Sequence, residues 1–374
     1  MLNSLYINNY RNLKDLKINS LGSVNLIAGK NNTGKSALLE AIAIYATNGD
    51  INLIYKLIDE RGETLKKKNE KGNQEETNVK ILSSLFTNRI AGFDTAVNSI
   101  FIGECKNTFE ETLSPNNCVL LRFAKVFDEL SSKEQRSTKN SKLFTDDIAI
   151  EKVKIGFQIN TRNGINIYTL DNDIPYRFST NDNMEIKHNV QFVRTRNFDR
   201  GVNGSLFDKI ALTDKEQHVI NALKIIEPLV ERIAFVEEPF NERTAVIKLS
   251  DSQQILPLQS MGDGINRILT IILALVNADK GHVLIDEFEN GLHYSVQEKL
   301  WTIIFKLSSE LNIQVFVTTH SDDCIRGFES ALNQSNNASN GKLIRLDNVN
   351  GIIRQVDFDA RELKIATDQN IEIR

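Results

Sequence analysis

The sequence predicts an α/β protein, and three features support this fold class. An apolar segment at Val24–Ala28 is followed by a glycine-containing loop and then by segment 37–45, which has the composition and period of a helix. The last third of the chain alternates between helical and strand-like segments, as a parallel sheet requires. One of these strand-like segments ends on two carboxylates, Asp286 and Glu287, and α/β proteins bind ligands at the carboxyl ends of their strands.

Length and charge set the frame for this prediction. The chain has 374 residues and a net charge of −4, from 45 basic and 49 acidic side chains. This length suits one large α/β domain, or a core domain with a substantial insertion. The charge gives no general electrostatic argument for binding nucleic acid, and none against a local basic patch.

The scattered cysteines and the lack of a targeting or membrane-spanning segment predict a cytoplasmic protein without a membrane partner. Cys105, Cys118 and Cys324 are scattered without C-x-x-C spacing, which predicts neither a disulfide framework nor a zinc site. No apolar run approaches the roughly 20 residues that cross a bilayer. Residues 1–6 lack the basic region and apolar core of a signal peptide.

The chain is expected to begin with a small β-element. Two short strands are predicted at 2–8 and 13–18, with a turn between them that contains Arg11. A third strand, Val24–Ala28, then leads into the glycine loop. Arg11 could approach a ligand of that loop, but an ordinary surface position is the favoured interpretation.

The loop Gly29–Ser36 has the form G-x-x-x-x-G-K-[ST] in the strand–loop–helix context of a phosphate-binding loop. Its glycines let successive backbone N–H groups point at a phosphate, and the helix N-terminus adds partial positive charge. We expect Lys35 to contact the β- and γ-phosphates of a nucleotide, and the Ser36 hydroxyl to bind Mg²⁺. A structural glycine turn is the alternative, and the flanking segments disfavour it. The predicted nucleotide-binding residues are Asn31, Asn32, Thr33, Gly34, Lys35, Ser36 and Ala37.

The middle of the chain, residues 51–240, is expected to form an α+β insertion. Residues 61–77 are almost entirely polar, so they cannot bury enough apolar surface to order themselves and predict a mobile loop, as does segment 131–142. Thr213–Glu216 has the form of a capping box and predicts a helix through Ile226. Strands are expected at 118–123, 150–159, 191–193, 233–236 and 245–249.

Two strands of the last third are expected to end at the same edge of the sheet. The segment Val283–Glu287 ends on the acid pair, in which we expect Asp286 to hold Mg²⁺, directly or through water, and Glu287 to activate the attacking water as a general base. Segment 312–318 ends in Thr-Thr-His-Ser, and a helix at 294–311 connects the two strands. His320 would then lie near Glu287 and sense the γ-phosphate. Solvated strand ends are the alternative for both segments.

A serine and two glycines precede a helix expected at 268–278. Ser260, Gly262 and Gly264 can form an anion cradle at its N-terminus. Many helices begin in this way, so the informative point is the place of this segment just before the acidic strand.

These motifs together resemble those of the ABC ATPases of the SMC, RecF and OLD class. Gly29–Ser36 is similar to Walker A and Val283–Glu287 to Walker B, while Ser260–Gly264 resembles a degenerate cassette signature. Glu289–His293 resembles the D-loop, and Thr319–Ser321 the segment that carries the switch histidine. The glutamine of the Q-loop has no clear counterpart.

The resemblance implies an ABC-type P-loop NTPase head with a mixed sheet, split into residues 1–50 and 241–374 around the insertion. It implies an ATPase that uses ATP and Mg²⁺, with Lys35, Glu287 and His320 as catalytic residues and Ser36 and Asp286 at the metal. Heads of this class dimerise around ATP. A homo-oligomer is therefore implied, in which the signature of one protomer closes over ATP held by its partner.

The resemblance also suggests which process the ATPase serves. OLD enzymes carry a C-terminal Toprim nuclease, but only 54 residues follow His320 here, whereas such a module needs on the order of a hundred. Asp357 and Asp359 mimic a metal-binding Asp-x-Asp pair, but a terminal strand with exposed acids is favoured. A stand-alone AAA-type ATPase is therefore implied, similar to those of anti-phage defence systems such as PARIS, with a separate Toprim-like or other nuclease or toxin as its effector. The alternative is a RecF-like or SMC-like ATPase of DNA repair or maintenance, which the lack of a large basic stripe disfavours.

Overall fold

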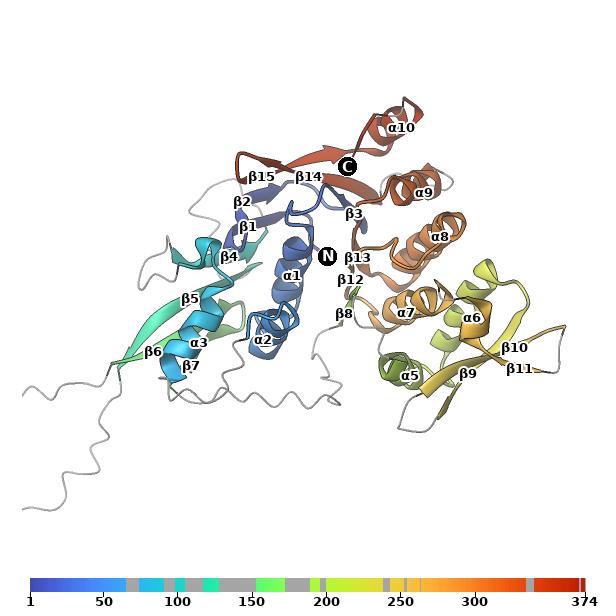
Figure 1. Cartoon of the computed structure of the whole chain (residues 1–374), viewed down its shortest axis with the longest axis horizontal. Coiled ribbons are helices and arrows are strands. Elements are labelled where there is room, and N and C mark those ends of the chain that lie inside the picture. The colour runs from blue at the N-terminus through green and yellow to red at the C-terminus, as the bar shows by residue number, and fades with distance from the viewer. Residues whose placement is uncertain are drawn as a thin grey trace, which may run out of the picture.

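The computed structural model describes residues 1–64, 74–90, 98–104, 117–127, 153–171, 189–195, 200–237, 243–251, 254–262, 264–333, 340–369 and 371–373. This part of the chain forms three sheets with helices between and around them (Figure 1). Two sheets have six strands and one has three. The predicted α/β fold class is confirmed.

The central sheet is mixed, and it carries the glycine loop. Its strand order is β15-β14-β3-β13-β12-β8, and all neighbours pair in parallel except the edge strand β15. The chain order therefore differs strongly from the spatial order, and β3 lies between two strands from the last sixth of the chain. The strands are β3 (Val24–Ala28), β8 (Val190–Val193), β12 (His282–Ile285), β13 (Gln314–Thr318), β14 (Gly341–Val349) and β15 (Ile352–Phe358).

Both faces of the central sheet are buried, which explains its nearly continuous apolar strands. Alternate residues of β13 belong to two different cores: Val315 and Val317 face one, and Phe316 faces the other. Helix α1 covers one face, while α7, α8 and α9 cover the opposite face (Figure 1). These helices are α1 (Lys35–Ala46), α7 (Gly264–Asn277), α8 (Tyr294–Leu311) and α9 (Asp322–Asn333).

An antiparallel sheet lies beyond α1, in the order β2-β1-β4-β5-β6-β7. Most of its buried apolar residues share one core with α1 and α2, while Tyr6, Phe101 and Cys118 form a small separate cluster. The first two strands come from the chain's start and the other four from the expected insertion, so both segments build one sheet. The elements are β1 (Leu5–Tyr10), β2 (Leu13–Ile18), β4 (Ile100–Gly103), β5 (Cys118–Phe127), β6 (Val153–Thr161), β7 (Gly164–Thr169), α2 (Ile51–Glu60), α3 (Gln74–Ser83) and the 3₁₀ turn η1 (Thr87–Arg89).

The third sheet, β11-β10-β9, stands at the other end of the molecule beside α5, α6 and α7 (Figure 1). It leads directly into the serine–glycine segment. At the C-terminus, α10 packs on α9 and on the β14–β15 hairpin. These elements are α5 (Arg200–Asp208), α6 (Asp214–Ile226), β9 (Val230–Glu237), β10 (Arg243–Leu249), β11 (Ile255–Pro257), η5 (Leu258–Met261) and α10 (Ala360–Asp368).

Three local predictions were wrong in part. Residues 74–77 begin α3 rather than a loop, because the Glu75 carboxylate accepts a hydrogen bond from the backbone N–H of Ile155, a contact with β6 that the sequence does not show. The capping box is incomplete, since Glu216 accepts from the N–H of Leu212 rather than of Thr213. Of the two terminal acids, only Asp359 is exposed, and it caps α10.

Some of the sequence predictions concern residues outside the described part of the chain. These are Cys105 and the segments 65–73, 131–142 and 150–152.

None of the helices described in the structure is both long and apolar enough to cross a bilayer.

Candidate functional site

The glycine loop joins β3 to α1 in a backbone path that needs its small residues. Gly29, Asn32 and Gly34 all have φ in the left-handed region, at 145°, 63° and 90°. A Cβ on Gly29 would also lie 2.5 Å from the carbonyl oxygen of Leu346. Gly34 is the N-cap of α1 and makes no side-chain cap. The N–H groups of the first helical turn therefore stay available to an anion.

The Lys35 ammonium lies within the loop. Its Nζ donates to the carbonyl oxygens of Gly29 at 2.6 Å and Lys30 at 2.9 Å. Burial lowers the pKa of Lys35, while the nearby carboxylates, Asp286 first among them, act in the opposite direction. The structure thus places a desolvated cation where the loop would hold a phosphate chain.

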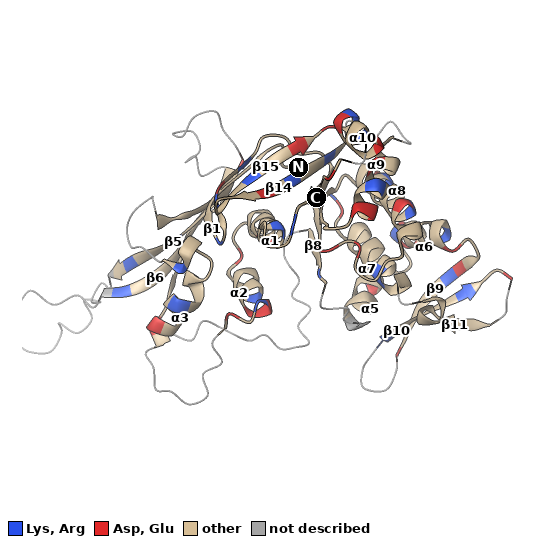
Figure 2. Ribbon diagram, turned by 45° about the horizontal axis from the view of Figure 1, so that its top comes forward, with Lys and Arg blue, Asp and Glu red and all other residues tan. Residues whose placement is uncertain are grey.

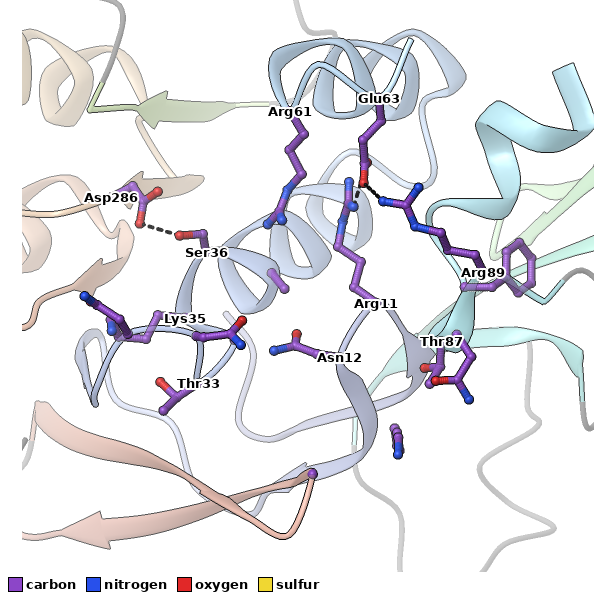
Figure 3. A pocket seen from close by; sticks show the side chains of 18 of the residues that line it. Arg11, Asn12, Thr33, Lys35, Ser36, Arg61, Glu63, Thr87, Arg89 and Asp286 are labelled. Atoms are coloured by element: carbon purple, nitrogen blue, oxygen red, sulfur yellow. Dashed lines mark hydrogen bonds and ion pairs between the residues drawn. The ribbon is translucent and has the colours of Figure 1, made fainter. Parts of the chain in front are cut away.

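The acid pair follows β12 and meets the loop at the carboxyl edge of the sheet. Asp286 Oδ1 accepts a hydrogen bond from Ser36 Oγ at 3.2 Å (Figure 3). It accepts a second one from Thr318 Oγ1 at 2.6 Å. The Thr318 hydroxyl also accepts from the N–H of Glu287 at 2.9 Å. Glu287 itself adopts a left-handed conformation with φ of 50°. The start of α1 and the ends of β12 and β13 are therefore joined by hydrogen bonds to the Asp286 carboxylate.

His320 is held by a residue whose role the sequence did not reveal, Glu289. The Glu289 carboxylate lies 3.0 Å from the ring Nδ1 of His320 and accepts from the backbone N–H of the same residue at 3.0 Å. Its other oxygen accepts from the Thr319 hydroxyl at 2.8 Å. A carboxylate partner of this kind fixes the tautomer and orientation of an imidazole. The signal in the sequence is a third acid shortly after the strand, in the segment that resembles a D-loop.

Replacing Glu289 with alanine is expected to lower kcat about tenfold, because the His320 ring loses the carboxylate that orients it. ATP affinity should change little, since Glu289 itself does not line the cavity beside the phosphate loop. Glu289→Gln keeps an oxygen acceptor and should lose less activity. Single-turnover hydrolysis and equilibrium binding of ATP would measure both quantities.

Glu329→Ala on α9 is a matched control for this prediction, since Glu329 is half-buried and its carboxylate accepts a hydrogen bond from Asn333 of the same helix. Equal kcat for Glu289→Ala and this control would show that His320 does not depend on Glu289.

The preferred surface interpretation of Arg11 was wrong. Its side chain is only 7% exposed and forms ion pairs with Glu40 at 2.9 Å and Glu63 at 2.8 Å. Glu40 also binds Arg61 at 2.7 Å. Glu63 binds Arg89 at 2.9 Å, as Figure 3 shows. The partners of Arg11 lie far away in sequence, so no local pattern could have indicated this network.

One cavity of about 800 Å³ gathers most of the predicted site. The phosphate loop from Asn31 to Ala37 lines it, as do Asp286, Glu287 and His320. The other lining residues include Arg11 and Asn12 of the β1–β2 turn and Thr87 (Figure 3). Gly351, at the tip of the β14–β15 hairpin, lines the cavity as well.

The serine–glycine segment does not line this cavity. Ser260 and Gly262 are exposed, and the Ser260 hydroxyl donates to the carbonyl oxygen of Pro257 at 2.7 Å. Gly264, the first residue of α7, lies close to the loop that follows β12, residues 286–291, which we call the acidic loop. A Cβ on Gly264 would lie 2.8 Å from the carbonyl oxygen of Gly291. In a single chain these residues therefore flank the site without entering it.

A phosphate loop, an acid pair and a threonine–histidine segment at one edge of a mixed sheet, beside an antiparallel sheet, define an ABC-type P-loop ATPase head. The chain belongs to the family described as "AAA domain, putative AbiEii toxin, Type IV TA system", which matches residues 24–323. It is thus an AAA-type ATPase, as its motifs predicted.

Comparison with individual proteins agrees with this class. The chain is 25% identical over 369 residues to an "ATP/GTP phosphatase" of Helicobacter pylori, and the match covers 92% of each protein. Among solved structures, it is similar to an SMC head bound to the C-winged helix domain of ScpA, with a TM-score of 0.50, 11% identity, and 98% and 99% of the two chains covered. The SMC head domain of Thermotoga maritima gives a TM-score of 0.43 at 13% identity, over 96% of this chain and 99% of that one. At 11% identity, the first of these two structures shows a shared fold alone.

Proposed function

We propose that this ATPase binds ATP in the 800 Å³ cavity and that ATP-dependent pairing of two heads controls a separate effector, a nuclease or another toxin, in bacterial anti-phage defence. The observation that carries the proposal is the meeting of the phosphate loop, the acid pair and His320 in this one cavity. The ATPase activity belongs to the family, whereas the residue roles and the biological output are our proposal.

The donor atoms beside the loop fit a magnesium ion. The Ser36 hydroxyl and the Asp286 carboxylate are hard oxygen ligands that lie 3.2 Å apart. Magnesium prefers oxygen ligands, keeps several waters, and is held by one or two protein groups together with substrate phosphates. When bound, the ion would neutralise charge on the β- and γ-phosphates.

The chain's own residues would then divide the chemistry among them. Lys35 and the loop N–H groups bind the phosphates, and Glu287 accepts a proton from the water that attacks the γ-phosphorus. The bond between the γ-phosphorus and the β–γ bridging oxygen breaks, which releases ADP and phosphate. His320, held by Glu289, donates a hydrogen bond to the γ-phosphate as its charge shifts.

Pairing of two heads is supported by the residues that the cavity leaves out. Ser260, Gly262 and Gly264 lie beside the site at the start of α7, and the first two are exposed. We infer that they close over ATP held by the phosphate loop of a partner protomer. ATP would then join the two heads, and hydrolysis would release them.

An effector in defence is supported by the family, whose description names a toxin of a toxin–antitoxin system. The charge distribution also disfavours nucleic acid as the direct ligand, because basic and acidic positions are interspersed along the described C-terminal helices (Figure 2). The effector would therefore be a protein that the head dimer sequesters or licenses.

A pull-down of the tagged chain from its native host, with ATP and beside Lys35→Ala, tests this proposal. We expect a stoichiometric nuclease-like or toxic partner, recovered in smaller amounts with the variant. That partner should be toxic when expressed alone and be neutralised by the wild-type chain. Recovery of only DNA and repair proteins, together with DNA-stimulated and salt-sensitive hydrolysis, would support the DNA-maintenance alternative instead.

A further inference from the structure

Arg267 is a fully buried arginine in the first turns of α7. Its side chain is 1% exposed. Nη1 donates to the carbonyl oxygen of Arg194 at 2.8 Å, and Nη2 donates to those of Asp286 at 2.8 Å and Glu287 at 3.1 Å. One guanidinium therefore joins the segment after β8 to both carboxylate-bearing residues after β12.

A charge in this position needs a specific reason. Burial of a guanidinium is costly even when hydrogen bonds compensate it, and well-packed apolar side chains often replace buried ion pairs without loss of stability. Burial lowers the pKa of Arg267 to about 10, against the opposing effect of Asp286, Glu287 and Glu289. The side chain nevertheless stays charged at neutral pH and keeps its donors directed at the strand ends.

The main chain of Glu287 is held on both sides. Its N–H donates to the Thr318 hydroxyl at 2.9 Å, and its carbonyl oxygen accepts from Arg267 at 3.1 Å. Its φ of 50° is unfavourable for a residue with a side chain, so the conformation depends on such contacts. These two bonds fix the direction in which the Glu287 side chain leaves the backbone.

The same helix also contacts the acidic loop one turn earlier. Gly264, the first residue of α7, approaches the carbonyl oxygen of Gly291 so closely that a side chain there would collide with it. The start of α7 thus touches the acidic loop at Gly264 and at Arg267, directly after the exposed Ser260 and Gly262. A movement of this helix end would reach the acid pair through both contacts.

We propose that Arg267 is a positioning residue: it holds the backbone of Asp286 and Glu287 so that the Glu287 carboxylate meets the attacking water, and it makes this geometry depend on the position of α7. The proposal rests on the role of Glu287 as general base. It adds a physical link between the serine–glycine segment and the step of proton transfer.

Arg267→Met and Arg267→Lys test the proposal, with Arg243→Met as a matched control. Arg243 lies on β10, where it packs against Gly204 of α5 and pairs with Asp208, away from the cavity. We expect kcat per binding-competent site to fall on the order of 10- to 100-fold in Arg267→Met, as for a misplaced catalytic group. KM should stay within about threefold. Arg267→Lys keeps the positive charge but not the two guanidinium nitrogens that donate to separate carbonyl oxygens, so its kcat should fall less than that of Arg267→Met. Titration with methylanthraniloyl-ATP gives the number of competent sites, and the control should match the wild type.

The double variant Glu287→Gln/Arg267→Met shows whether Arg267 affects hydrolysis through Glu287. If methionine prevents folding, Glu287→Gln/Arg267→Lys takes its place. Single-turnover hydrolysis should show no further loss beyond Glu287→Gln alone, because residues that act as one unit are not additive. Additive losses, or an unchanged kcat per site in the Arg267 variants while Glu287→Gln is inactive, would overturn the inference alone. Wild-type hydrolysis by Glu287→Gln would instead refute the proposed base, and the inference with it.

Discussion

Replacement of Lys35 with alanine is expected to abolish measurable ATP hydrolysis and to weaken ATP binding roughly 30- to 100-fold, as the loss of charge-assisted hydrogen bonds predicts. The Lys35 ammonium is the cation at the centre of the phosphate loop, where it donates to the carbonyl oxygens of Gly29 and Lys30. Alanine removes the charge that we propose binds the β- and γ-phosphates. Isothermal titration with ATP and a phosphate-release assay would measure the two effects.

Lys30→Ala provides a control within the same loop. The Lys30 side chain is 73% exposed and makes only a loose ion pair with Glu372 at 3.7 Å, so its removal should leave binding and hydrolysis close to wild type. Comparable losses in both variants would mean that the loop responds to net charge rather than to the placement of Lys35.

Glu287→Gln is expected to retain ATP binding while kcat falls on the order of 10²- to 10⁴-fold, the usual contribution of a general base. Glutamine keeps the size of the side chain but cannot accept the proton of the attacking water. Because bound ATP then persists, the variant should accumulate as a closed head dimer. Analytical ultracentrifugation with and without ATP would detect this dimer.

Glu310→Gln is a suitable control variant for Glu287→Gln, because Glu310 lies half exposed on α8 and pairs with His218 and Lys306 away from the cavity. It should hydrolyse ATP as the wild type does and show no trapped dimer. A Glu287→Gln protein that is as monomeric with ATP as without it would show that head closure is the wrong mechanism for this chain.

Local patterns in the sequence were sufficient for the phosphate loop, the acid pair and the elements around them. The strand at Val24–Ala28 and the helix at Tyr294–Leu311 have the bounds that periodicity predicted. These segments are buried by their own sheet neighbours, so their apolar pattern directly reflects the fold. The order of strand, helix and strand then placed Asp286 and His320 at one edge.

The supporting contacts could not be predicted, because each joins residues that are distant along the chain. Arg11 looked like a surface residue since Glu63 lies 52 positions away. Arg267 follows the serine–glycine segment, and no local pattern indicates its contact with Arg194, which lies 73 positions earlier. The same holds for Glu289, whose bond to His320 spans 31 positions. Composition and periodicity report local structure and burial, and they do not report which buried charges meet.

The place of β3 has a consequence for how the protein is made. This strand, near the start of the chain, lies between β13 and β14, and the N–H of Leu2 bonds to the side chain of Gln314 across 312 positions. Contacts of such sequence separation form late and slow folding, since the loop must close before the pairing is gained. During synthesis, both edges of β3 stay without their partner strands until the last sixth of the chain has left the ribosome. Nascent chains therefore cannot assemble this candidate site, and the unpaired strand is a segment for chaperones to protect.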